Sequence, residues 1–234
     1  MFYACLKKDI LAHARKERAK VNAWFFKTGK GEYGEGDAFW GLTMGQQRSL
    51  AQKYKEAPFE EIKRLLNSNY HEERMIGLLI LVFRFEKGDV RRKKQVFDFY
   101  IKHRRAINNW DLVDVTCPNI VGEWLINKPR ALLYRFARSK NLWEKRIAIL
   151  ATYRFIRRDD FNDTFAIAEL LLNDEHDLIH KAVGWMLREV GKRSVATEEA
   201  FLKKHYKHMP RTMLRYAIEK IPEARRRAYL KGTV

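Results

Sequence analysis

The stretch IHKAVGWMLREV, residues 179–190, decides the fold class of this chain. Its apolar residues fall at positions i, i+3, i+4, i+7, i+8 and i+11, which is the spacing of one face of an α-helix. Residues 75–82 and 147–151 repeat that spacing. Polar–apolar alternation is scarce, and 12 glycines with 5 prolines are too few for a β protein with frequent turns. The sequence therefore predicts an all-α protein.

A short motif recurs along the helical part of the chain. A cation precedes small and aliphatic residues at Arg74, Arg146, Lys181 and, more weakly, Arg215. The last three lie 35 and 34 residues apart, a period that favours a HEAT-like helical-repeat α-solenoid. We expect residues 1–234 to form one such domain, with these cations lining a concave basic groove. Chance is the competing explanation, since 47 of the 234 residues are Lys or Arg.

The charge balance predicts a polyanionic partner. Lys and Arg exceed Asp and Glu by 47 to 29, which leaves a net charge of +18. The excess is clustered in residues 87–105, 200–218 and 225–227. Solvated helix faces are the alternative explanation, but they need no bias of sign. Phosphate binding accounts better for the clusters, and a rod-like DNA duplex fits a concave groove.

Membrane and secreted classes fit this sequence poorly. No run of 18 apolar residues occurs, so we expect no membrane span. The first ten residues, MFYACLKKDI, do not have the pattern of a signal peptide. Cys5 and Cys117 lie far apart in the sequence, so we do not expect a disulfide framework. We therefore expect a cytoplasmic protein that does not bind membranes.

Two motifs resemble ligand sites, but the surrounding sequence lacks the features that such sites need. Residues 29–34, GKGEYG, match the GxGxxG dinucleotide fingerprint, but no strand precedes them and the acidic residues nearby would repel a pyrophosphate. His176 and His180 are four residues apart, as two metal ligands on a helix would be. No third ligand with a recognisable spacing accompanies them. We therefore expect neither a cofactor nor a metal.

The segment NNWDLVDVTCP, residues 108–118, carries a different signal. If the segment is helical, Trp110 and Asp114 share a face, because they are four residues apart. On spacing alone, a core tryptophan beside capping or ion-paired aspartates is the simpler explanation. A carboxylate on a DNA-facing surface would repel phosphate and would need a local purpose. Stabilising the sugar cation during glycosidic cleavage supplies one.

Several segments in order carry a resemblance to a known family. Residues 109–114, 143–149 and 181–189 resemble the bacterial AlkD family of DNA alkylation repair glycosylases. The glycine-rich N-terminal segment 25–41 is similar to the loop that this family carries there. Together these segments extend over most of residues 20–195.

The resemblance implies a HEAT-like solenoid that holds double-stranded DNA in its groove and acts as a monomer in the bacterial cytosol or nucleoid. It also implies a monofunctional DNA glycosylase without a cofactor. Such an enzyme hydrolyses the N-glycosidic bond of cationic N3- or N7-alkylated purines without capturing the base in a pocket. By motif, Asp114 is the catalytic carboxylate, Trp110 and Trp185 flank the lesion nucleotide, and Arg146 holds backbone phosphate.

Departures from the family pattern leave alternatives open. Residues 41–46, GLTMGQ, lack an expected proline, which leaves a DNA contact near Thr43–Gln46 unassigned. Val115 is less polar than the commoner residue after the catalytic aspartate. A non-catalytic HEAT-like DNA-binding scaffold would explain the charge and the repeats, but not the set formed by Trp110, Asp114 and Trp185. A paralogue specific for bulkier adducts is the third interpretation.

Overall fold

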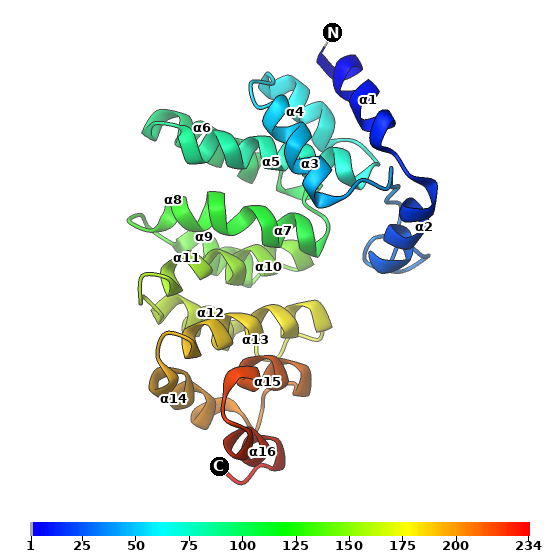
Figure 1. Cartoon of the computed structure of the whole chain (residues 1–234). Coiled ribbons are helices and arrows are strands. Elements are labelled where there is room, and N and C mark those ends of the chain that lie inside the picture. Colours follow the sequence, from blue (N-terminus) through cyan, green and yellow to red (C-terminus); the bar gives the residue numbers. More distant parts are fainter. Residues whose placement is uncertain (1) are drawn as a thin grey trace. The chain divides into compact units, whose positions relative to one another are not determined.

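The computed structural model describes residues 2–234, and this part of the chain is helical (Figure 1). Turns join most of the helices, and a longer loop, residues 26–43, joins α2 to α3. An isolated backbone bridge between Ala38 and Tyr70 is the sole β-type pairing within residues 2–234. The prediction of an all-α protein is confirmed. Within the same residues, no helix has both the length and the apolarity that a membrane span requires.

The helices divide into two compact units, one ending at Ile120 and the other comprising Val121–Val234. The single domain expected from the sequence stays a prediction. The helices of the first unit, with bounds, are α1 (Phe2–His13), α2 (Lys16–Phe25), α3 (Met44–Lys53), α4 (Phe59–Leu66), α5 (His71–Lys87), α6 (Val90–Lys102), the 3-10 turn η1 (Arg104–Ala106) and α7 (Trp110–Cys117). The π-helical turn η2 (Pro118–Gly122) contains the boundary between the units.

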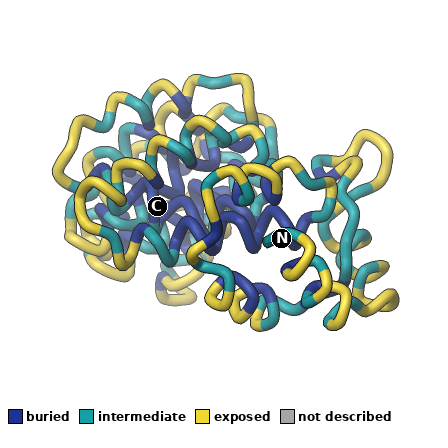
Figure 2. The backbone as a smooth tube through the Cα atoms, turned by 90° about the horizontal axis from the view of Figure 1, so that it is seen from above, coloured by how far each residue is buried: buried dark blue, intermediate teal, exposed yellow. Residues whose placement is uncertain are grey.

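Helix α5 is the centre of the first unit. Nearly all of its residues are buried, since α3, α4, α6 and α7 pack around it. Gly77 lets α4 come close, because a Cβ atom at this position would meet the Cβ of Leu65 at 3.2 Å. Buried stretches alternate with exposed turns along the backbone in the tube representation (Figure 2).

Helices α10 and α13 are the centre of the second unit, and shorter helices pack against them. Helix α13 contains the predicted helical stretch 179–190, and all six of its periodic apolar residues are buried. The helices of this unit, with bounds, are α8 (Glu123–Leu125), α9 (Ala131–Ala137), α10 (Leu142–Ala151), α11 (Tyr153–Ile156), α12 (Asn162–Leu171), α13 (Asp177–Gly191), α14 (Val195–His205), α15 (Arg211–Ala217), the 3-10 turn η3 (Ile218–Lys220) and α16 (Glu223–Lys231).

Polar side chains define where several helices begin. Thr43 and Gln46 form a reciprocal capping box at the start of α3, which satisfies two backbone donors at that end. Asn141 accepts hydrogen bonds from two backbone N–H groups at the start of α10. Prolines precede α4, α15 and α16, where the missing N–H group costs no helical hydrogen bond.

Two of the recurring cations are not exposed in the way that the repeat motif predicted. Arg74 and Arg146 are each only 4% exposed and donate hydrogen bonds to the backbone carbonyls of Ser68 and Leu178. At these two positions the cation is largely buried within its own unit, and a groove lined by the recurring cations stays a prediction. The motif marks a register at which an arginine ties its helix to a neighbouring segment, and a buried guanidinium requires such partners.

Candidate functional site

Helix α7 carries two of the predicted site residues, Trp110 and Asp114. The side chain of Asn109 accepts a hydrogen bond from the backbone N–H of Trp110 at 2.8 Å, at the first residue of the helix. The three residues between Trp110 and Asp114 are buried, whereas Trp110 and Asp114 are both half-buried. The two side chains therefore lie on the same accessible face of α7, as their spacing predicted.

A buried ionic network fixes the first turn of α7. The Nε2 atom of His71 lies 2.9 Å from Oδ2 of Asp111, and its Nδ1 atom lies 3.2 Å from Oδ2 of Asp37. The guanidinium of Arg74 donates to the same oxygen of Asp37 at 2.6 Å. The network therefore joins the N-terminal loop, the start of α5 and the start of α7.

The network keeps His71 protonated. Burial alone lowers the pKa of this imidazole, but the charge of Asp111 and the hydrogen bonds to Asp111 and Asp37 raise its pKa to about 9. Burial raises the pKa of Asp37, yet the hydrogen bond from His71 and the charge of Arg74 bring it below the usual value. The network sets His71 and Arg74 against Asp37 and Asp111, so each buried charge has a partner of opposite sign.

Aromatic rings from the N-terminal loop cover this network and support Trp110. Phe26 stacks on Trp110 with ring centroids 5.4 Å apart, and on His71 at 4.7 Å. Phe39 in turn stacks on Phe26 at 5.3 Å and on His71 at 5.0 Å. Phe25 meets the Trp110 ring edge-on. The indole is thus held by packing in one orientation.

The buried carboxylate of Glu72 shapes the loop that carries Phe39. It accepts hydrogen bonds from the consecutive backbone N–H groups of Trp40, Gly41 and Leu42 at 3.0, 2.8 and 3.2 Å. Gly41 has a φ of +80°, and a Cβ atom there would lie 2.1 Å from the carbonyl oxygen of Arg15. Only glycine fits this close approach of two backbones. The predicted glycine-rich loop is therefore a defined structure.

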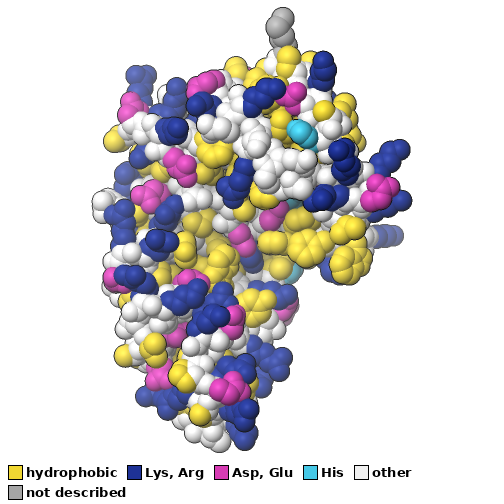
Figure 3. Space-filling view, in the orientation of Figure 1, with side chains coloured by type: hydrophobic (Ala, Val, Ile, Leu, Met, Phe, Trp, Pro, Cys, Tyr) yellow, Lys and Arg dark blue, Asp and Glu magenta, His cyan; other side chains and the backbone are white. Residues whose placement is uncertain are grey.

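Helix α2 presents aromatic side chains to solvent beside the Trp110 cluster. Trp24 is 73% exposed and Phe25 is 51% exposed, and no residue of α2 is buried. Hydrophobic side chains gather over α2 in the space-filling view, with Lys and Arg side chains around them (Figure 3). An exposed aromatic patch with a basic surround is typical of an interaction surface.

The second unit carries the other two predicted site residues, Arg146 on α10 and Trp185 on α13. Trp185 is half-buried, and its indole N–H donates to Oε1 of Glu189 at 3.0 Å. Lys192 donates to the same carboxylate oxygen at 2.6 Å. The guanidinium of Arg146 is buried and donates to the carbonyl of Leu178, so part of its donor capacity is used within the unit.

The structure brings Trp110 together with Asp114, and it places Arg146 and Trp185 on neighbouring packed helices. That all four residues converge on one nucleotide stays a prediction. Sequence reasoning missed His71 and Asp37 and assigned Arg74 to the groove, whereas the structure joins the three in the network that positions α7. The available signal was the run of charged residues at the start of α5, the most buried helix of its unit.

Among residues 2–234, no group of three or more His, Cys, Asp or Glu side chains could hold a metal ion. His176 instead caps α13, accepting a hydrogen bond from the backbone N–H of Leu178 at 3.1 Å.

The model of one protein family, described as DNA alkylation repair enzyme, matches residues 6–221. The match extends over both units. This chain belongs to the family of DNA alkylation repair enzymes. Its family membership gives it a role in DNA repair, with DNA as the substrate.

A solved structure supports the fold of this DNA alkylation repair enzyme. The chain is similar to a predicted DNA alkylation repair enzyme from Enterococcus faecalis, with a TM-score of 0.69 and 14% sequence identity. The alignment covers 90% of this chain and 98% of the other. No curated protein matches the sequence. At this identity the likeness establishes the helical-repeat fold alone.

Proposed function

We propose that this DNA alkylation repair enzyme is a glycosylase of the AlkD type, which releases cationic N3- and N7-alkylated purines from duplex DNA. The carboxylate of Asp114 stabilises the sugar cation and orients the attacking water. Trp110 and Trp185 flank the lesion nucleotide, and Arg146 binds a phosphate near the site. A monomer without a cofactor suffices for this reaction.

One observation carries the proposal: the accessible face of α7 pairs an indole with a carboxylate four residues later. If these two residues served the core alone, their positions would be buried like those of the three residues between them. Both are half-buried instead. The His71–Asp111 pair and the Phe26 stack fix the helix turn that presents them. Preorganised groups of this kind favour a charged transition state.

The chemistry needs little beyond a carboxylate and an aromatic surface. An alkylated purine that carries a positive charge leaves as a neutral base, so no general acid is required to protonate it. The bond between C1′ and the base nitrogen breaks first, leaving an oxocarbenium-like sugar next to the carboxylate of Asp114. Water then adds at C1′ and gives up a proton, which yields an abasic site with both strands intact. Trp110 can hold the cationic base through cation–π contact.

Base release from methylated duplex DNA tests the proposal. The wild-type protein should release 7-methylguanine or 3-methyladenine without cutting the strand. Asp114→Asn should lose at least about a hundred-fold in release, the order expected for one electrostatic group, and should keep its affinity for DNA. Asp98→Asn is the matched control, because Asp98 is an exposed carboxylate on α6 that pairs with Lys94.

Two other outcomes identify the alternatives. Tight binding of duplex DNA without any base release, by the wild type and over a panel of adducts, would reject the glycosylase and leave the scaffold. Release limited to bulky adducts, still abolished by Asp114→Asn, would identify the paralogue with a shifted lesion preference. The basic composition supports DNA binding by an enzyme and by a scaffold alike. The position of Asp114 is the feature that distinguishes the enzyme from the scaffold.

A further inference from the structure

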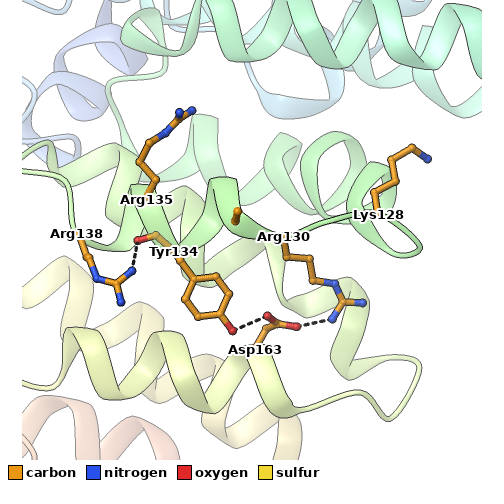
Figure 4. A pocket seen from close by; sticks show the side chains of 7 residues that line it. Lys128, Arg130, Tyr134, Arg135, Arg138 and Asp163 are labelled. Carbon is orange, nitrogen blue, oxygen red and sulfur yellow. Dashed lines mark hydrogen bonds and ion pairs between the residues drawn. The ribbon is translucent and has the colours of Figure 1, made fainter.

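A hollow of about 680 Å³ lies between α9 and α12 of the second unit (Figure 4). Its wall is formed by the loop before α9, by α9 itself and by one residue of α12. None of its lining residues belongs to α10 or α13, the helices that carry Arg146 and Trp185. The residues that matter for its chemistry are Lys128, Arg130, Tyr134, Arg135, Arg138 and Asp163.

One acidic residue in this hollow is already neutralised. The Asp163 carboxylate accepts a hydrogen bond from the Tyr134 hydroxyl at 2.6 Å and pairs with the guanidinium of Arg130. Arg130 also pairs with Asp160 at 2.7 Å and lies over the Phe155 ring at 3.7 Å. Through these contacts Arg130 forms part of the wall of the hollow. The half-buried ring of Tyr134 lies at its centre.

Three further cations of the hollow have no acidic partner. Within residues 2–234, no carboxylate oxygen lies within 4.0 Å of the charged groups of Lys128, Arg135 or Arg138. All three are exposed. Lys128 lies over the ring of Trp124 at 3.9 Å, and Arg138 donates only to the carbonyl of Tyr134 in its own helix. Some exposed cations elsewhere in this unit do pair with a carboxylate, as Arg193 does with Asp159.

The three cations are strung along the hollow and do not converge on one point. Arg135 lies in the last turn of α9 and Arg138 directly follows the helix, three residues later, so the two are neighbours on its surface. Lys128 and Arg138 stand at opposite ends of the hollow in Figure 4, and Arg135 points away from Asp163. A single phosphate ion would need donors gathered around it. A row of cations beside an aromatic ring matches the successive phosphates of a nucleic-acid backbone.

We propose that the hollow on α9 is a second nucleic-acid contact, which binds a phosphodiester backbone separately from the helices that carry Arg146 and Trp185. The proposal does not depend on glycosylase activity. It assigns a function to the cluster of unpaired charge on α9, which the candidate site does not use. An enzyme with such a contact holds more DNA than the lesion site alone requires.

The test replaces Lys128, Arg135 and Arg138 together by Gln and measures affinity for an undamaged duplex of about 20 base pairs as salt is varied between about 50 and 200 mM. Each lost phosphate contact reduces the slope of log affinity against log salt by about one. We expect the slope to fall by about two to three. Single-turnover base release at saturating protein should remain within about two-fold of the wild type.

A matched variant controls for net charge. Arg193→Gln, Arg226→Gln and Arg227→Gln together remove the same formal charge from two exposed positions and one half-buried position of the same unit, where each arginine pairs with a carboxylate. For this variant, the slope of log affinity against log salt should differ from the wild-type slope by no more than about 0.5. The charge-preserving set Lys128→Arg, Arg135→Lys and Arg138→Lys should also keep it, because a salt slope counts charges and not their shape.

An equal change of slope in the α9 variant and the charge control would overturn the proposal, and so would no change in either. Binding of inorganic tripolyphosphate tests the alternative ligand, a small polyphosphate in place of a DNA backbone. If the α9 variant loses tripolyphosphate binding but keeps the wild-type slope with DNA, the hollow is a site for a small polyphosphate and the proposal is wrong. Loss of DNA binding by the α9 variant, beyond that of the control, supports the proposal.

Discussion

The imidazole of His71 on α5 lies 2.9 Å from the carboxylate of Asp111 in the first turn of α7, across 40 residues of sequence. Asp111 stands between Trp110 and Asp114, and the same imidazole also contacts Asp37 of the N-terminal loop. A substitution of His71 therefore alters the positions of Trp110 and Asp114 on the face of α7, although it replaces neither of them. This relationship makes His71 a positioning residue for the proposed reaction.

His71→Gln is expected to lose both stability and base release. Glutamine is neutral and leaves two buried carboxylates without their shared cation, which costs about 3–5 kcal/mol when one partner of a buried pair is removed. Base release should fall by at least about ten-fold through kcat, because Asp114 is displaced and not removed. Chemical denaturation and single-turnover kinetics measure the two effects.

His103→Gln is the control for this substitution, since His103 is a half-buried histidine on the same unit that bonds only to the carbonyl of Phe99 and stacks on its ring. It should change stability modestly and leave base release unchanged. If His71→Gln folds and releases base at the wild-type rate, His71 does not position α7.

The stability of the protein should fall at alkaline pH through His71. Folding raises the pKa of this group from 6.5 to about 9, so the folded state binds the proton more tightly than the unfolded state. The stabilisation is complete below pH 6.5 and is lost as the pH rises from 6.5 through 9. The difference in unfolding free energy between the wild type and His71→Gln should therefore shrink over that window. Denaturant titrations at pH 6, 7.5 and 9.5 check this, and a constant difference would contradict it.

Periodicity predicted the helices well because it reports which residues share a face. Residues 179–190 lie within α13, and Trp110 and Asp114 share a face of α7, as their spacing required. Periodicity does not report depth. Arg74 and Arg146 sit at a register that predicts an exposed groove, yet each is buried by a neighbouring segment of its own unit.

The ionic network could not be predicted from local pattern, because its members come from distant segments. Asp37 lies 34 residues before His71, and Asp111 lies 40 residues after it. The run of His71, Glu72 and Glu73 at the start of an apolar helix was the one local sign. Charged residues are rarely buried unless they are paired, so a charged run beside a hydrophobic run predicts partners without identifying them.

Trp24→Ala is expected to weaken DNA binding without lowering stability. The ring is 73% exposed, so its removal should change the unfolding free energy by no more than about 0.5 kcal/mol. A stacked or inserted aromatic residue contributes about 1–3 kcal/mol to nucleic-acid binding, which predicts a loss of about ten-fold in affinity. Val90→Ala, at an equally exposed apolar residue of α6, should leave affinity unchanged. Equal affinities for the wild type and Trp24→Ala would show that α2 does not contact DNA.

Arg146→Gln separates a structural role from phosphate binding. Loss of its hydrogen bond to the Leu178 carbonyl should cost about 1–3 kcal/mol of stability. A phosphate contact would in addition reduce the salt slope of DNA binding by about one. Arg84→Gln is the control, because Arg84 bonds to the carbonyls of Lys55 and Ala57 in the other unit. It should lower stability and keep the slope. An unchanged slope in Arg146→Gln would assign Arg146 to the fold alone.

Glu198→Gln should stabilise the protein, increasingly so as the pH rises. Burial and the charge of Glu199 raise the pKa of this carboxyl from 4.5 to about 8, against the charge of Arg188. The folded state therefore favours the neutral acid, and stability is lost as the pH rises from 4.5 through 8, by at most about 1.4 kcal/mol per pH unit. Glutamine is neutral throughout and avoids that loss. Glu199→Gln should have the opposite effect, because Glu199 pairs with Arg225 at 2.8 Å. Denaturant titrations at pH 5 and pH 8 measure both, and a gain for Glu198→Gln that is no larger at pH 8 would refute the buried neutral acid.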